Sequence, residues 1–292
     1  MKKITRFPSL LICLSGYLFS FFVVLFLYKL TGRPRDLLMA TFVYDLAATF
    51  LIFLFSVAFN NTSFYDPYWS VAPFLILLAW YNHTGIHVGD PDRQWLIMTL
   101  VLLWALRLTF NWARRWKGLG DEDWRYAGFR SYPRPVYWLI SLAGFHLFPT
   151  LIVFSGCLSV YPALCRLSQP VGLTDGIAFI ISLSGIAIET IADKQLSVYR
   201  RNKSRKPFLS EGLWKYSRHP NYFGEILFWT GLCVFSMQMR PFAWYTLAGP
   251  AAMILMFSFI SAPMMDKRMK ERNPGYAEYA RKTSALVPWK SS

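Results

Sequence analysis

The chain has 292 residues, of which 54% are hydrophobic and 18% aromatic but only 16% charged, and its mean hydropathy is +0.30. This balance excludes an ordinary soluble domain and predicts an all-α, polytopic membrane bundle of about seven or eight spans. The net charge of +15 does not indicate a nucleic-acid partner, because the basic residues lie between apolar segments. No Pro-, Ser- or Gly-rich linker divides the sequence, so we expect a single membrane domain over residues 1–292.

Several apolar segments approach the length of about twenty residues that a transmembrane helix requires. The first is expected to be an uncleaved helix rather than a signal peptide, because no small-x-small cleavage site follows it. The third is short and contains Pro73, so it is expected to be tilted, partly re-entrant or part of a pocket wall. The candidate spans are 8–30, 36–58, 68–82, 94–113, 135–160, 172–193, 222–239 and 242–261.

The distribution of Lys and Arg predicts how these spans are oriented. Basic residues concentrate in 107–134, in 194–218 and in the tail after residue 266, so these segments should share the cytoplasmic face, together with the C-terminus. The basic loop 29–35 conflicts with an eight-span model whose N-terminus is inside. A seven-span model with the N-terminus outside, in which 68–82 does not cross, removes the conflict, and both models stay open.

Cysteine usage gives no sign of a disulfide framework or a structural zinc site, because no C-x-x-C pair occurs. We predict no metal site and expect the cysteines to pack in the core. They are Cys13, Cys157, Cys165 and Cys233.

The first basic segment places donors beside a span. In G-D-E-D-W-R-Y-A-G-F-R, Arg125, Tyr126 and Arg130 alternate with acids and aromatics, which on composition alone predicts a solvated, salt-bridged loop. Arg107 lies inside the apolar run WALRLTFNW. An arginine within a span marks a functional site or a paired charge, but so close to the interface it can also snorkel to the surface.

The second basic segment begins with two acids on one helix face, Glu189 and Asp193, spaced i, i+4 and followed by Arg200. They require either a polar cavity or cationic partners, and both interpretations stay open. The tail carries Arg268 and Tyr276 and is expected to form an amphipathic interfacial helix.

The stretch S-R-H-P-N-Y-F-G-E joins a proline turn to an apolar run. The proline biases His219 away from helix, so a helix can begin near Asn221, with Arg218 and His219 beside its anion-binding end. A helix cap and a topogenic arginine explain Asn221 and Arg218 but leave Glu225 unexplained. Together with the two neighbouring segments, this stretch suits a large, multiply anionic, partly aromatic cofactor. No G-x-G-x-x-G or P-loop motif is present.

The segments ETIADKQLSVYR, FLSEGLWKYSRHPNYFGEILFWTG and MDKRMKERNPGYAEYARKTSALVPW resemble the C-terminal domain of the steroid 5-alpha-reductase superfamily. The branch that they resemble most is its bacterial members of unassigned substrate, catalogued as domain of unknown function 1295. W-x-x-R-L at 104–108 and E-D-x-R-Y at 122–126 extend the resemblance, which covers roughly 100–290. It implies N-terminal helices on the substrate side (1–100) and a cofactor-binding region (101–292).

The resemblance implies a reductase of the bacterial inner membrane that uses NADPH to reduce a carbon–carbon double bond conjugated to a carbonyl. Its substrate would be lipid-soluble, steroid- or isoprenoid-like, and would enter from the bilayer. Matching family positions implies cofactor contacts at Arg107, Asp193, Arg200, Tyr216 and Asn221, with looser matches at Arg268 and Tyr276. With the donors noted above, the predicted cofactor set adds Arg125, Tyr126, Arg218 and His219.

One departure concerns the groups that hold the substrate carbonyl. The steroid enzymes use a Gln–Glu pair and a tyrosine, whereas this chain has no Gln–Glu pair and has Trp104 in place of the tyrosine. A replacement acid could come from Asp66 or Tyr68, or from Tyr44–Asp45. The predicted catalytic set is Asp66, Tyr68 and Glu225, the last matching the family's N-[FY]-x-G-E glutamate.

Two other functions fit part of the pattern. Isoprenylcysteine and phospholipid methyltransferases of membranes also carry an R-H-P-x-Y-x-G-like turn and bind S-adenosylmethionine there. Their characteristic Glu pair is absent, since this chain has Met265-Asp266-Lys267, which favours the reductase. The third possibility is a lipid-binding protein that keeps the nucleotide pocket without turnover.

Overall fold

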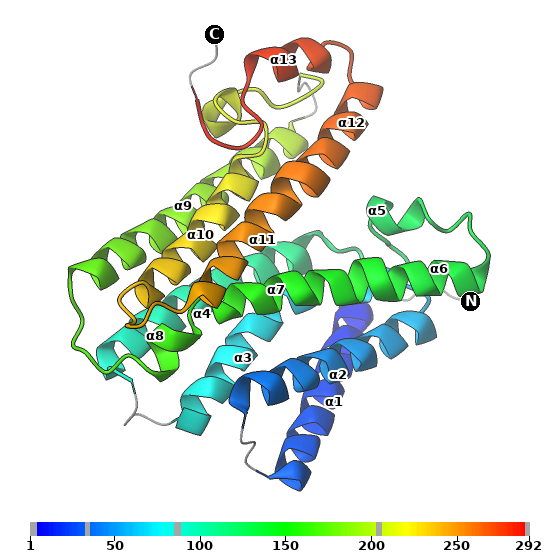
Figure 1. Cartoon of the computed structure of the whole chain (residues 1–292). Helices are drawn as coiled ribbons and strands as arrows, with labels where there is room; N and C mark the ends of the chain where they lie inside the picture. The colour runs from blue at the N-terminus through cyan, green and yellow to red at the C-terminus, as the bar shows by residue number, and fades with distance from the viewer. Residues whose placement is uncertain (1–4, 33–35, 85–88, 203–205, 290–292) are drawn as a thin grey trace. The chain divides into compact units, whose positions relative to one another are not determined.

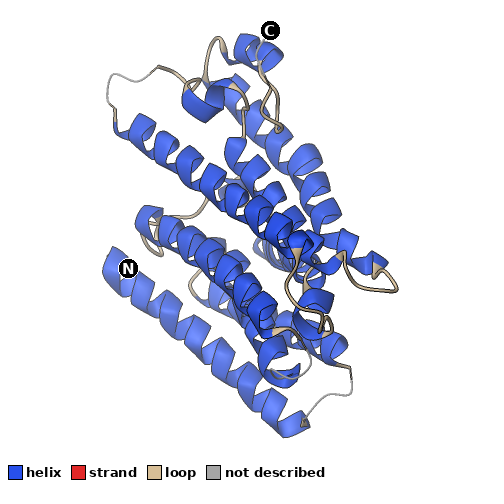
Figure 2. Cartoon of the chain, turned by 90° about the vertical axis from the view of Figure 1, so that its left-hand side faces the viewer, coloured by secondary structure: helices blue, strands red, loops and turns tan. Residues whose placement is uncertain are grey.

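The computed structural model describes residues 5–32, 36–84, 89–202 and 206–289. Contacts divide the chain into two compact units, which are described separately. The N-terminal unit comprises Met1–His83 and Val101–Phe154, and the C-terminal unit comprises Thr84–Leu100 and Ser155–Ser292. The described residues form helices and no strand (Figure 2), apart from an isolated bridge between Ser217 and Ser284.

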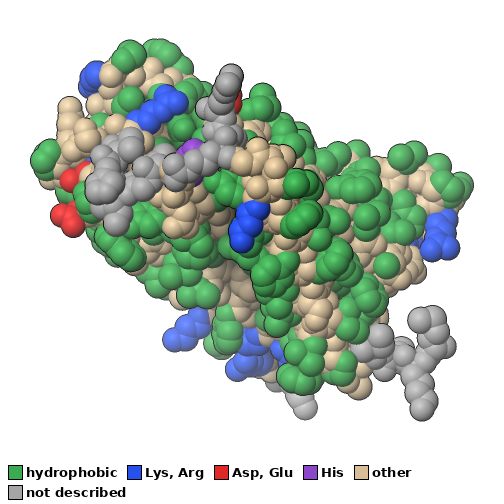
Figure 3. Space-filling model, turned by 90° about the horizontal axis from the view of Figure 1, so that it is seen from below, with side chains coloured by type: hydrophobic (Ala, Val, Ile, Leu, Met, Phe, Trp, Pro, Cys, Tyr) green, Lys and Arg blue, Asp and Glu red, His purple; other side chains and the backbone are tan. Residues whose placement is uncertain are grey.

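The predicted all-α membrane bundle is confirmed. Among the described residues, six helical segments are long and apolar enough to cross a membrane. Hydrophobic side chains cover much of the face shown in Figure 3, with Lys and Arg at a few separate places. The six segments are Arg6–Thr31 (α1), Leu37–Ala58 (α2), Pro91–Arg115 (α4), Arg134–Leu158, Leu173–Arg201 (α9) and Trp244–Arg272.

Two further helices occupy the remaining predicted positions, Tyr68–Thr84 (α3) and Pro220–Ser236 (α10). Each has 17 residues and is therefore about 25 Å long, slightly less than the hydrocarbon thickness. Residues 33–35, which carry two arginines of the basic loop behind the choice between seven and eight spans, lie outside the described residues. Both span counts therefore stay predictions.

Two of the long segments contain a π-helical turn just before a proline. Arg134–Leu158 consists of α6 (Arg134–Ile140), the π-turn η2 (Ser141–Leu147) and α7 (Phe148–Leu158), with Pro149 following the π-turn. Trp244–Arg272 consists of η4 (Trp244–Leu247), α11 (Ala248–Met256), the π-turn η5 (Phe257–Ser261) and α12 (Ala262–Arg272), and here Pro263 follows. A proline removes one N–H and crowds the preceding turn, which the wider π-turn accommodates.

The tail differs from the interfacial helix that the sequence predicts. Its first part, α12, continues the preceding span, because the π-turn lets the helix pass Pro263. A separate short helix, α13 (Tyr276–Lys282), follows the left-handed Gly275. The expectation of one separate interfacial helix is therefore wrong for 262–272.

In the N-terminal unit, α1 packs against α2 and the 3₁₀ turn η1 (Thr62–Phe64). Gly16 permits this approach, because a Cβ there would lie 2.8 Å from the Phe64 ring. The Phe64 ring stacks on Phe55 and Phe59, and Tyr17 donates a hydrogen bond to the Phe64 carbonyl at 3.1 Å. The short helix α5 (Trp124–Ala127) lies between α4 and α6 in the sequence.

In the C-terminal unit, α9 and α10 run side by side with their backbones in contact (Figure 1). A Cβ on Gly185 would lie 2.6 Å from the Gly224 carbonyl, and one on Gly231 would lie 2.2 Å from Ser182 Oγ. Small residues therefore form the seam between these helices, as is common in membrane bundles. The unit also contains α8 (Tyr161–Cys165) and η3 (Gly212–Lys215).

A fully buried ion pair fastens the start of α4 to the start of α9. Arg93 donates to both carboxylate oxygens of Asp175, at 2.7 and 3.0 Å, and neither side chain is exposed. Its remaining donors bond the carbonyls of Leu167, Gln169 and Pro170. These additional bonds satisfy the guanidinium, as a buried charge requires.

The seam between α9 and α10 can be tested with two glycines of α9. Gly185→Ala should destabilise the protein by roughly 1–3 kcal/mol, because the new methyl group meets backbone that cannot move aside. Gly176→Ala is the matched control, since a Cβ there meets nothing within 4 Å. Melting followed by tryptophan fluorescence in detergent checks both. Equal melting temperatures for the two variants would contradict the seam.

Candidate functional site

The proline turn and the C-terminal tail are joined by main-chain hydrogen bonds. Arg218 N donates to the Ser284 carbonyl at 2.8 Å, and Trp289 N donates to the Tyr216 carbonyl at 3.1 Å. Ser217, between them, is fully buried and forms the bridge with Ser284. The tail thus holds the turn from which α10 begins.

The centre of this junction is the buried carboxylate of Asp266. Its Oδ2 accepts from Arg218 Nε at 3.1 Å and Nη2 at 2.9 Å. Its Oδ1 accepts from the Tyr276 hydroxyl at 2.6 Å and lies 3.0 Å from His219 Nε2, whose N–H donates. Burial, aided by the neighbouring carboxylate, raises the pKa of Tyr276 above its usual range, so the phenol keeps the proton that it donates.

Three residues predicted to bind the cofactor therefore contact Asp266: Arg218, His219 and Tyr276. Arg218 also donates through Nη1 to the carbonyls of Ala280 and Thr283, both at 2.5 Å. Arg218 thus uses these N–H donors to hold the turn to α12 and the tail. Asp266 itself was missing from the predicted site, although an acid within the apolar and basic run S-A-P-M-M-D-K-R was a signal for a buried pair.

A second group lies where α9 ends and α10 begins. Gln195 Oε1 accepts from Leu213 N at 3.0 Å, and Trp214 Nε1 donates to the Ala192 carbonyl at 3.3 Å, which joins η3 to α9. Four residues of the predicted cofactor set belong to these segments. Asp193 is partly buried, Arg200 is exposed, Tyr216 is 42% exposed, and Asn221 lies in the first turn of α10.

Asn221 supplies the observation that tests a dinucleotide at this end of the unit. Its Oδ1 is buried and has no hydrogen-bond partner among the described residues. A buried acceptor of this kind requires a hydrogen-bond donor, and the amide or the adenine amino group of a dinucleotide would provide one. The exposed guanidinium of Arg200 suits a phosphate. The residues present therefore fit the cofactor.

Two buried glutamates lie on α9 and α10, one on each helix. Glu225 Oε1 accepts from Trp229 Nε1 at 3.0 Å, one turn further along α10. Glu189 lies against Gly224, where a Cβ would come within 2.5 Å of Glu189 Cγ. The packing of Trp229 thus gives Glu225 a structural role that the sequence did not reveal, and its catalytic role stays a prediction.

In the N-terminal unit, the structure brings together two of the residues considered as replacement acids. The Tyr68 hydroxyl donates to Asp45 Oδ1 at 2.6 Å, and both side chains are buried. Asp45 Oδ2 is also buried and has no hydrogen-bond partner among the described residues. A hydrogen-bonded acid pair with one unsatisfied oxygen can hold or deliver a proton.

Asp66 belongs to a different cluster of the same unit. It accepts from the Tyr126 hydroxyl at 2.6 Å, and burial raises the pKa of its carboxyl to about 6 against the opposing effect of Arg125. Arg125 is exposed and bonds Asp123 through Nε at 2.8 Å. The structure thus groups predicted catalytic Asp66 with predicted cofactor residues Arg125 and Tyr126.

The two remaining arginines of the predicted set lie on long helices. Arg107 is partly buried in α4, in the N-terminal unit, and Arg268 is partly buried in α12, in the C-terminal unit. Each takes part in an interaction.

Comparison with known proteins gives one family and one distant relative. The family model "Protein of unknown function (DUF1295)" matches residues 52–283. An uncharacterized protein of Schizosaccharomyces pombe is 27% identical over 263 residues, which cover 80% of this chain and 74% of the yeast protein. No solved structure matches.

The Asp266 junction can be tested by removing its charge. Asp266→Asn should cost roughly 3 kcal/mol, because the largely buried guanidinium of Arg218 loses its counter-ion. It should also expose the tail, 273–289, to limited proteolysis. Glu278→Gln is the control, since Glu278 pairs with Lys282 on the exposed surface and should leave melting and cleavage unchanged. An Asp266→Asn variant as stable and protease-resistant as the parent would contradict this role.

Proposed function

Since the chain belongs to the DUF1295 family, whose function is unknown, we propose that it is a membrane-embedded, NADPH-dependent reductase. It would reduce a carbon–carbon double bond conjugated to a carbonyl in a lipid-soluble, steroid- or isoprenoid-like substrate. The sequence resemblance of 189–225 to the steroid 5-alpha-reductase superfamily supports the class of reaction. The observation that carries the proposal is the buried, unsatisfied Oδ1 of Asn221 at the start of α10.

Residues at the α9–α10 end of the C-terminal unit would hold the cofactor. Arg200 would bind a phosphate, Asn221 Oδ1 would accept from an amide or amino N–H, and Tyr216 would offer its ring and hydroxyl. The Asp266 junction would position Tyr216 and Asn221, because it fixes the turn between them. When bound, NADPH supplies the hydride that adds to the β-carbon of the acceptor.

We assign proton donation to the hydrogen-bonded pair of Asp45 and Tyr68. In its protonated form, Asp45 can donate from Oδ2 while Oδ1 still accepts from Tyr68, so the pair can polarise a carbonyl oxygen. Of the predicted catalytic residues, Glu225 is engaged by Trp229 and Asp66 by Tyr126. Tyr68 acts in the proposed pair by donating to Asp45 Oδ1, which leaves Oδ2 to donate.

The location of the protein is part of the proposal. We assign it to a bacterial inner membrane with a cytoplasmic C-terminus, on the basis of the Lys and Arg distribution and the resemblance to the bacterial branch. The substrate would reach the protein through the bilayer, in keeping with its apolar chemistry.

Cofactor binding is the first test. Purified protein in detergent should bind NADPH and be stabilised by it. Tyr216→Phe and Asn221→Ala should each weaken NADPH binding by up to about tenfold through loss of one hydrogen bond. Tyr245→Phe is the matched control, because Tyr245 is a similarly exposed tyrosine in η4. Stabilisation by S-adenosylmethionine and not by NADPH would contradict the reductase and favour the methyltransferase. Unchanged affinity in both variants would remove the assignment of Tyr216 and Asn221.

The proton donor is tested separately, with NADPH oxidation measured on a panel of steroid and isoprenoid enones. Tyr68→Phe should lower turnover, by at most the roughly 10²–10⁴-fold that a general acid contributes, because Asp45 loses the hydrogen bond to its Oδ1, with NADPH affinity unchanged. Tyr44→Phe controls for loss of a hydroxyl in the neighbouring helix, since Tyr44 bonds Thr31 instead. Full turnover in Tyr68→Phe would exclude Tyr68 but leave the cofactor site standing. NADPH binding without oxidation of any enone would indicate a lipid-binding protein.

A further inference from the structure

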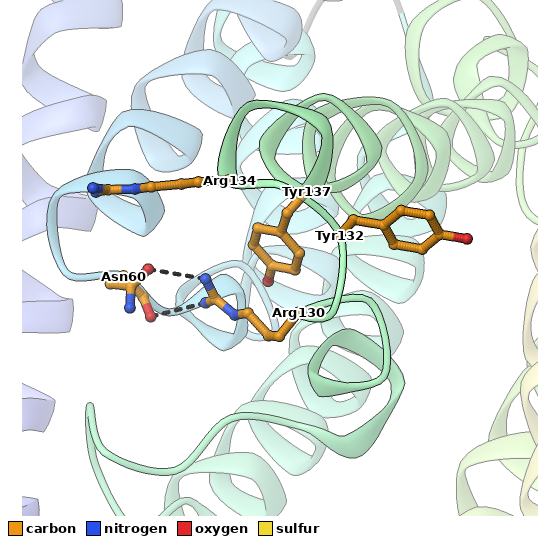
Figure 4. Close-up of a pocket in the computed structure, with 5 residues that line it drawn as sticks. All are labelled: Asn60, Arg130, Tyr132, Arg134 and Tyr137. Carbon is orange, nitrogen blue, oxygen red and sulfur yellow. Dashed lines mark hydrogen bonds between the residues drawn. The ribbon is translucent and has the colours of Figure 1, made fainter.

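A polar pocket of about 380 Å³ lies in the N-terminal unit, between the end of α2 and the start of α6 (Figure 4). It belongs neither to the Asp45–Tyr68 pair nor to the Asp66 cluster. Its lining combines two cations with two phenols and an amide: Asn60, Arg130, Tyr132, Arg134 and Tyr137.

One of the two arginines is held in place by the protein. Arg130 donates to Glu122 through Nε at 2.8 Å and Nη2 at 2.7 Å, and to Asn60 Oδ1 through Nη1 at 2.9 Å. Its guanidinium carbon lies 3.9 Å from the centre of the Tyr137 ring. Glu122 balances its charge, so Arg130 forms a rigid wall and orients the Asn60 amide.

The second arginine is available to a ligand. Arg134 is exposed, and neither its guanidinium nor Asn60 Nδ2 has a partner in the described part of the chain. In Figure 4 the Arg134 guanidinium lies on the Asn60 side of the view, the Asn60 amide and the Arg130 guanidinium lie below it, and Tyr132 points away to the other side. The pocket therefore has an uncompensated cation and an amide donor at its rim, which suits a phosphate.

The surroundings of the pocket indicate what carries that phosphate. Arg134 is the first residue of the apolar span Arg134–Leu158. Further along this span Leu139 is 67% exposed, and Val136 and Leu151 are exposed as well. Asn61 Nδ2 donates to the carbonyls of Leu119 and Asp121, which brings the loop that follows α4 to the same end of the unit. An acyl chain can lie along the exposed apolar surface while Arg134 attracts the headgroup.

We propose that this pocket binds the phosphate of an anionic phospholipid. Arg134 and Asn60 Nδ2 contact the phosphate oxygens, Arg130 holds Asn60 in position, and the acyl chains lie along the exposed side chains of α6 and α7. A free phosphate would gain nothing from the apolar surface, so the lipid is the ligand. This binding site is independent of the proposed reductase activity.

The test uses the full chain in nanodiscs of phosphatidylcholine containing a small fraction of phosphatidylglycerol. The lipid that stays bound after extraction is measured by native mass spectrometry. The parent protein should retain phosphatidylglycerol in preference to phosphatidylcholine, and Arg134→Gln should reduce that retention about tenfold. Arg134→Lys should restore part of it.

Arg114→Gln is the matched control. Arg114 is an exposed arginine at the end of α4 in the same unit, its contact is with the Phe110 ring, and its loss changes the net charge equally. It should retain phosphatidylglycerol like the parent. Equal loss in Arg134→Gln and Arg114→Gln would overturn the proposal in favour of diffuse electrostatic attraction. Displacement of the lipid by millimolar inorganic phosphate would overturn it in favour of a free-anion site. Equal retention of the two lipids by the parent would overturn it outright.

Discussion

A single buried carboxylate, that of Asp266, fixes the end of the C-terminal unit at which we propose the cofactor site. From its position on α12 it accepts hydrogen bonds from three residues of two other segments: Arg218 and His219 of the proline turn, and Tyr276 of the tail. A carboxylate has enough lone pairs to satisfy all three donors, and each donor is charged or polarised toward it. Together with Pro220 at the first position of the helix, these bonds fix where α10 begins.

The second constraint is the small-residue seam between α9 and α10. Because Gly185 and Gly231 let the two backbones touch, the helices cannot rotate without a clash. Glu225, one position after the seam residue Gly224, is held separately by the hydrogen bond that it accepts from Trp229. The Asp266 junction fixes the start of α10, and the seam fixes the helix further along. Asn221, in the first turn of α10, is therefore held in place by both.

The length and composition of the apolar segments predicted the helices well, because a membrane allows few alternatives to a helix of about twenty apolar residues. Contacts between helices were not predictable in this way. Asp45 and Tyr68 are 23 residues apart in the sequence, and His219 and Asp266 are 47 apart. The apolar pattern of one segment does not indicate which residue of another segment it contacts. Arg218 and His219 could thus be assigned to a ligand only because their internal acceptor was not visible in the sequence.

Because Arg218 and His219 both bond to Asp266, the R-H-P turn needs a different interpretation. If both side chains bound phosphate, the turn would lose the charges that hold it to the tail, and Asp266 would be left as a buried anion without partners. The anionic cofactor that we propose would then be bound by groups outside the junction. Those groups are the exposed Arg200, the ring and hydroxyl of Tyr216, and the unsatisfied amide oxygen of Asn221. The charged residues of the turn therefore position the site, and its less conspicuous polar residues are the ones suited to bind.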